Sequence, residues 1–121
     1  MSATINVFRN TSERTQYKDG QTIFSAGQPG NVMYVVLSGE VEVRHDNQEL
    51  ARVGPGQPLG EMALIDDAPR SATAVARGDC TLAVIDQKRF LYMVQETPQF
   101  ALTVMQVLVE RLRESHQITM D

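Results

Sequence analysis

The residues best suited to chemistry gather in residues 54–74, which read GPGQPLGEMALIDDAPRSATA. Their spacing predicts a short helix that begins at Gly60 and runs to about Ile65. The first amide groups of a helix lack intrahelical partners and lie at the positive end of its dipole, so they favour an anion. Arg70 follows the helix beyond a proline, and a chain reversal would bring its guanidinium over the same anion. Arginine is well suited to two parallel bonds with a phosphate.

Glu61 adds a carboxylate to this anion site. It falls in the first turn of the predicted helix, where the dipole favours a negative charge. From there it can also accept hydrogen bonds from hydroxyl groups of a ligand. A phosphate site beside a carboxylate that accepts from hydroxyls suggests a ribose phosphate. The ordinary alternative is a structural ion pair between Glu61 and Arg70 that holds a loop.

Composition bounds the kind of protein that carries this segment. The chain has 121 residues, 42% of them hydrophobic, so we expect one domain over residues 1–121. A single cysteine, Cys80, excludes an internal disulfide and a cysteine-cluster zinc site. The net charge is −4 with no basic stripe, so nucleic acid is not an expected partner.

The ends of the chain and its apolar runs bear on its location. The start lacks a secretory signal, and no apolar run approaches the roughly 18–20 residues of a membrane span, so we expect a cytoplasmic protein without a membrane partner. The natural-looking start and the polar tail of residues 115–121 favour a complete chain.

Short apolar segments of strand length follow one another up to about residue 85, separated by glycine and proline. These segments are residues 23–24, 32–37, 41–44, 50–53, 73–77 and 81–85. His45-Asp46-Asn47-Gln48 is typical of a hairpin turn. Several short strands at close spacing predict an all-β sandwich or barrel over about residues 13–85.

Helical spacing replaces this pattern over about residues 86–115. Asp86 is a good N-cap for a short helix to about Gln95, and Pro98 suits the first position of a second helix. From there apolar residues recur at steps of three and four to about Ser115, which predicts an amphipathic helix. These residues are Phe100, Ala101, Val104, Met105, Leu108 and Leu112.

The stretch GEMALIDDAPRSAT resembles the phosphate-binding cassette of cyclic nucleotide-binding domains, a family that includes kinase regulatory subunits, gated ion channels and bacterial catabolite activator proteins. The family pattern F-G-E-φ-A-φ-φ-x-x-x-P-R-x-A, with φ apolar, runs from Leu59 to Ala72 without a gap, although Leu59 replaces the usual aromatic residue and Pro58 is an additional stiff residue. Upstream, YKDGQTIFSAGQPGNVMYVVLSGEVEV (residues 17–43) is similar to the family's first strands. The likeness covers about residues 13–114. It implies a mainly β fold with C-terminal α-helices, a double-stranded β-helix or jelly-roll-like β-roll.

The resemblance implies a role for each cassette residue. Glu61 would bond the ribose 2′-hydroxyl, and Arg70 would neutralise the cyclic phosphate. Backbone amides near the two would complete the phosphate cradle, and these belong to Gly60, Glu61, Met62, Ala63, Ser71 and Ala72. A hydroxyl after the arginine contacts the phosphate or the purine of cGMP in the family whereas alanine favours cAMP, so Ser71 leaves the purine open.

The last helix would supply an apolar lid over the base through Leu108 and Leu112, with Arg113 as a further polar contact. The family often pairs through this helix, so a homodimer seam is expected there as well.

Three function classes follow. The favoured one is a stand-alone binder of cAMP or cGMP that acts on an effector protein in trans and needs no cofactor or metal, since no helix-turn-helix, kinase or transmembrane segment follows. The alternative is a degenerate domain that serves as an interaction scaffold without nucleotide. An enzyme is not expected, because His45 and His116 lie far apart and no nucleophile–base pairing is specified.

Overall fold

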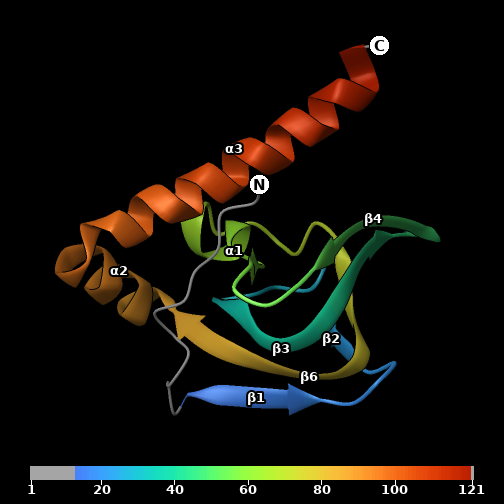
Figure 1. Cartoon of the computed structure of the whole chain (residues 1–121), viewed down its shortest axis with the longest axis horizontal. Helices are drawn as coiled ribbons and strands as arrows, with labels where there is room; N and C mark the ends of the chain where they lie inside the picture. The colour runs from blue at the N-terminus through green and yellow to red at the C-terminus, as the bar shows by residue number, and fades with distance from the viewer. Residues whose placement is uncertain (1–12, 121) are drawn as a thin grey trace.

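The computed structural model describes the backbone of residues 13–120 and the side chains of residues 13–113, so the start of the chain and the side chains of the polar tail lie outside this description. A β-roll comes first and helices come last, as the sequence predicted (Figure 1). The strands are β1 (Arg14–Tyr17), β2 (Thr22–Phe24), β3 (Val32–His45), β4 (Gln48–Val53), β5 (Pro58–Leu59) and β6 (Thr73–Asp86).

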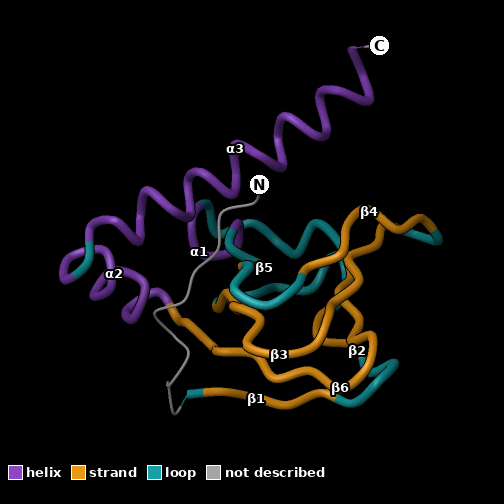
Figure 2. Tube along the Cα trace, in the orientation of Figure 1, coloured by secondary structure: helices purple, strands orange, loops and turns teal. Residues whose placement is uncertain are grey.

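All strand pairs are antiparallel, in the order β1-β6-β3-β4, with β2 added to β6 and β5 added to β3. The long strands β3 and β6 pair along their lengths, from Val32 opposite Asp86 to Arg44 opposite Thr73. β3 and β4 are joined by the predicted hairpin turn, in which Asp46 has a φ of +56°. The strands curl around a common interior (Figure 2).

The prediction of two short strands in each of the segments 32–44 and 73–85 was wrong, because β3 and β6 each run on as one strand. β3 bends in its middle, where its pairing with β6 shifts register between Val36 and Glu40. Gly39 sits at this bend with a φ of +88°, and a Cβ there would overlap the backbone oxygen of Asp79. Glycine therefore allows the paired strands β3 and β6 to approach closely here, where the sequence pattern indicated an end to the strand.

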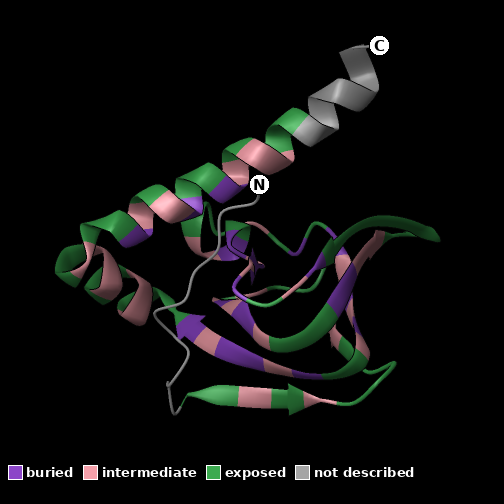
Figure 3. Cartoon of the chain, viewed as in Figure 1, coloured by how far each residue is buried: buried purple, intermediate pink, exposed green. Residues whose placement is uncertain are grey.

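The core has two parts (Figure 3). One lies inside the roll and includes Phe24, Val36 and Leu82. The other lies between the roll and the C-terminal helices and includes Met33, Ile85 and Phe100. Alternation along β3 and β6 supplies both parts, since neighbouring residues of a strand face opposite sides.

The helices are α1 (Met62–Ile65), α2 (Gln87–Glu96) and α3 (Pro98–Met120). Asp86 caps α2 as predicted, because its side chain accepts a hydrogen bond from the Arg89 amide at 2.8 Å. α3 extends beyond the predicted end near residue 115 and lies across the roll above α1 (Figure 1). Within the described residues no helix is both long and apolar enough to span a bilayer.

Candidate functional site

A cavity of about 370 Å³ lies between the cassette, the β3–β4 hairpin and α3. Its polar side chains are Glu61, Arg70, Ser71 and Arg111. The rest of the wall is apolar side chains and backbone, from Phe24, Val43, Leu50, Ala51, Val53, Leu59, Gly60, Met62, Ala63, Pro69 and Ala72. The cavity thus joins a charged end to an apolar wall.

Glu61 occupies the N-cap position of α1 and is only 5% exposed. Its Oε1 accepts a hydrogen bond from Nη1 of Arg111 at 2.5 Å, and the two side chains form an ion pair. The second guanidinium nitrogen of Arg111 donates to the Pro58 carbonyl. Among the described residues, Oε2 of Glu61 is buried and has no hydrogen-bond partner. A buried carboxylate oxygen left unpaired is costly, so this atom is suited to accept a hydrogen bond from a ligand.

Arg70 is 7% exposed and also reaches the cavity. Its Nη1 donates to the Gly60 carbonyl at 3.0 Å and its Nη2 to the Val32 carbonyl at 2.8 Å. Burial lowers the pKa of the guanidinium, and the charges of Tyr34 and Glu61 act in the opposite direction. Arginine nevertheless stays protonated in proteins, so Arg70 brings a permanent positive charge to the wall.

The structural ion pair weighed as an alternative, between Glu61 and Arg70, is not formed. Glu61 pairs with Arg111 and Arg70 bonds backbone carbonyls instead. The two charges thus meet at one cavity without neutralising each other through direct contact.

The cassette residues predicted from the sequence all line this one cavity: Gly60, Glu61, Met62, Ala63, Arg70, Ser71 and Ala72. Gly60 has a φ of +74°, which strains any other residue, and a Cβ there would force Nη1 of Arg70 to move. Met62 and Ser71 are exposed, whereas Ala63 and Ala72 are buried. The Ala63 amide donates to the Gly60 carbonyl at 3.3 Å, within the turn itself.

The predicted lid residues lie elsewhere. Leu108 packs against the core between the roll and the helices, and Leu112 is 56% exposed, so neither lines the cavity. Arg113, expected to add a polar contact, is exposed. The contact from α3 comes from Arg111, two residues earlier.

Sequence reasoning missed Arg111, because its spacing places it on the inward face of α3 only once the structure shows which face is inward. Steps of four and three from Val104 through Leu108 lead to Arg111, so the arginine shares the inward face of the helix. A charged residue on that face needs a buried partner, and Glu61 is that partner. The apolar wall supplied by the hairpin was missed too, since nothing local in residues 43–53 shows that they face the cassette.

The arrangement suits an amphipathic anion that carries a hydroxyl. A phosphate fits the positive charge of Arg70, a hydroxyl fits the unpaired oxygen of Glu61, and a flat apolar group fits the wall. No three of the histidine, cysteine, aspartate and glutamate residues in the described part of the chain lie close enough together to hold a metal ion.

Known protein families bear on this geometry. Residues 14–97 match the family described as "Cyclic nucleotide-binding domain", which is more than half of the chain. The chain belongs to this family. Its members share the β-roll, so the predicted fold class is confirmed. The cassette and every residue of the cavity lining except Arg111 fall within the part of the chain that matches the cyclic nucleotide-binding domain.

Individual relatives agree with this assignment. The "Cyclic AMP receptor protein" of Thermus thermophilus is 35% identical over 108 residues, which are 85% of this chain and 50% of that protein. The crystal structure of the Thermus thermophilus catabolite activator protein superposes with a TM-score of 0.79 at 35% identity over 88% of this chain and 52% of that one. The c-di-GMP-responsive global regulator CLP of Xanthomonas campestris gives 0.78 at 26% identity over 91% and 58%.

The chain thus spans about half the length of the curated relative it matches. The relatives themselves are named as a receptor, an activator and a regulator. The expectation that nucleic acid is not a partner is not supported, because one relative is named for its link to gene expression.

Proposed function

We propose that this chain is a sensor of cAMP or cGMP that works through binding, without catalysis or a cofactor, and passes its occupancy to an effector protein in trans. The observation that supports it most is the pair of buried charges at one cavity, Arg70 and Glu61, the latter with one unpaired oxygen. The name of the Thermus relative adds cAMP as the first ligand to try.

In this proposal the cyclic phosphate lies against Arg70 and the ribose 2′-hydroxyl donates to Oε2 of Glu61. The base lies on the apolar wall of the hairpin, which is formed by Val43, Leu50, Ala51 and Val53. Ser71 offers its hydroxyl to the phosphate or to a purine edge, so it is the residue that would discriminate between cAMP and cGMP.

Arg111 connects the ligand to the last helix. It belongs to α3 and bonds the same carboxylate that accepts the ligand hydroxyl. A ligand shifts an equilibrium only by its differential affinity for the two states. Sharing Glu61 makes the position of α3 sensitive to the ligand, and Leu108 of the same helix would close over the base in the occupied state.

The outer face of α3 supports a homodimer. Four large apolar residues recur there at steps of three, four and three, and each is 44–56% exposed: Leu102, Met105, Val109 and Leu112. This spacing suits pairing with a second α3 as in a coiled coil. Sedimentation of the wild type and of a Met105→Glu variant tests the seam, because a dimer that uses it dissociates when the charge is added.

Calorimetric titration with cAMP and cGMP tests the binding function. Removing one partner of a buried, hydrogen-bonded charge pair costs about 2–5 kcal/mol, so Arg70→Ala should weaken binding about 30- to 5,000-fold. Arg77→Ala is the matched control, since that arginine lies on β6 away from the cavity lining. If the wild type shows neither heat nor a thermal shift with either nucleotide, the sensor proposal fails and the scaffold alternative replaces it.

A further inference from the structure

The Arg70 side chain is held from several sides in a way that the cassette sequence does not encode. Its guanidinium carbon lies 4.3 Å from the centroid of the Phe24 ring. Phe24 in turn stacks on Tyr34, with ring centroids 6.2 Å apart and an interplanar angle of 19°. The same guanidinium carbon lies 6.0 Å from the Tyr34 centroid, so the cation contacts Phe24 closely and Tyr34 at a longer distance.

Backbone groups fix the guanidinium within its own plane. The carbonyls of Gly60 and Val32 accept from Nη1 and Nη2, respectively. Gly30 lies so close that a Cβ there would overlap Nε of Arg70. An arginine carries five N–H donors in one rigid plane, so two hydrogen bonds to backbone carbonyls also fix the direction of the remaining donors.

Phe24 stabilises the Arg70 guanidinium without occupying any of its N–H donors. It is 9% exposed and lines the same cavity as Arg70. A cation over an aromatic face gains about 0.5–2 kcal/mol, more when both are removed from water. Because the ring occupies the face of the guanidinium, it leaves the edge with its N–H groups available to an anion.

We propose that Phe24 is a positioning residue for phosphate recognition: it acts through Arg70, by holding the guanidinium flat against the cavity wall, with Gly30 leaving the space that this pose needs. The inference rests on the proposed function and adds to it a residue from β2, outside the cassette. It places part of the specificity for a charged ligand in a strand about 46 positions before the arginine.

The variant Phe24→Leu removes the ring face and keeps an apolar side chain. Its affinity is measured for cAMP and for adenosine, which lacks the phosphate, by competition with a fluorescent cAMP analogue. The expected result is a loss of about 2- to 30-fold for cAMP with an unchanged affinity for adenosine, the range that corresponds to the cation–ring energy. Gly30→Ala, which displaces the guanidinium from its other side, should give the same selective loss.

Val36→Ala is the matched control for packing, since Val36 is fully buried in the same core as Phe24. It should lower the midpoint of thermal unfolding and leave the ratio of the two affinities unchanged. Equal losses for cAMP and adenosine in Phe24→Leu, or no loss for either, would overturn the positioning role while the sensor function stands. A wild type that binds neither compound would overturn both.

Discussion

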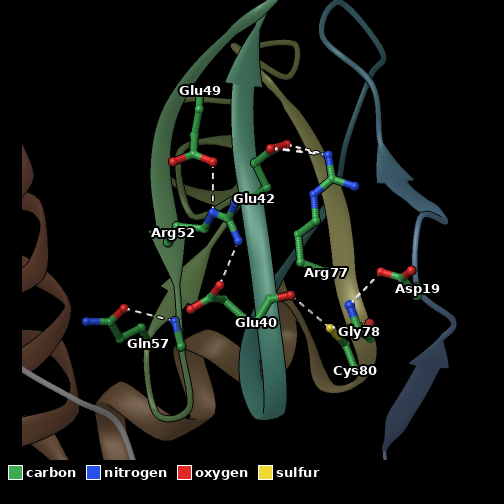
Figure 4. Close-up of polar contacts among 10 residues, drawn as sticks. Asp19, Glu40, Glu42, Glu49, Arg52, Gln57, Arg77, Gly78 and Cys80 are labelled. Carbon is green, nitrogen blue, oxygen red and sulfur yellow. Dashed lines mark hydrogen bonds and ion pairs between the residues drawn. The ribbon is translucent and has the colours of Figure 1, made fainter.

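Glu42 and Glu61 are buried carboxylates that each contact an arginine, but their surroundings differ. On the outer face of the sheet, both oxygens of Glu42 accept from Nη2 of Arg77, at 2.6 and 3.2 Å (Figure 4). Nη1 of Arg44 lies 3.8 Å from Oε1 of Glu42. At the cavity, only one oxygen of Glu61 is bonded and the other is left without a partner.

Neighbouring charges extend the contrast. Beside Glu42, Arg52 donates to both Glu40 and Glu49 at 2.8 Å, so the acidic groups of this face are paired within the sheet (Figure 4). At the cavity Arg70 bonds only backbone carbonyls and keeps its charge uncompensated by direct contact. A carboxylate bonded through both oxygens stabilises its own sheet, whereas one with a spare buried acceptor is suited to bind.

Among the tests of this contrast, the largest loss of cAMP affinity is expected when one of the two carboxylates is neutralised. Glu61→Gln should weaken cAMP binding about 10- to 150-fold, which corresponds to about 1.5–3 kcal/mol for a hydrogen bond to a charged group. Glu42→Gln should leave the affinity unchanged and lower the midpoint of thermal unfolding. Titration calorimetry and thermal melts on both variants check this. A loss of affinity in both would show that the two sites are not independent.

A smaller effect is expected from the arginine that joins Glu61 to α3. Arg111→Ala should weaken cAMP binding about 2- to 30-fold, because residues that couple two regions contribute about 0.5–2 kcal/mol. The variant should also lose any ligand-dependent protection of α3 in hydrogen exchange. The exposed Arg113 on the same helix provides the control, as Arg113→Ala. Tighter binding in Arg111→Ala would mean that the arginine competes with the ligand.

The smallest expected effect is on how the stability of the fold depends on pH, through Glu42 of the sheet. The hydrogen bond from Arg77 lowers the pKa of Glu42 below its ordinary value. The folded state thus holds this proton less tightly than the unfolded state, so the stabilisation is present above about pH 4.3 and is lost as the pH falls through the folded-state pKa. Acid melts should show a steeper loss of stability in the wild type than in Glu42→Gln. Equal slopes of stability against pH in the wild type and in Glu42→Gln would refute the stabilising role of the ionised Glu42.

The sequence predicted features that depend on local chemistry. The turn at residues 45–48 and the cap by Asp86 are each set within a few positions of the chain, and each is found in the structure. The shared location of the cassette residues was also predicted, from a short segment that resembles a known family. The continuity of β3 and β6 was missed because a glycine such as Gly39 is found both at strand ends and where paired strands approach closely. Only the position of the partner strand shows which of the two applies.

The face of α3 that packs inward could not be read from its own residues. The helix carries one apolar stripe with Phe100, Val104 and Val107 and another with Met105 and Leu112. Both satisfy a helical period, and docking against the roll decides which one is buried. The assignment of Leu112 to the cavity and the omission of Arg111 share this origin.

The long pairing of β3 with β6 also has a consequence for how the protein is made. The cassette lies in the connection between these strands, and Val32 pairs with Asp86 across it. Contacts so distant in sequence form slowly, since a long loop must close before they are gained. A nascent chain that ends before β6 carries every cassette residue but lacks the strand that pairs with β3 and the Arg111 side chain of α3. The complete site therefore forms only after translation has passed residue 111.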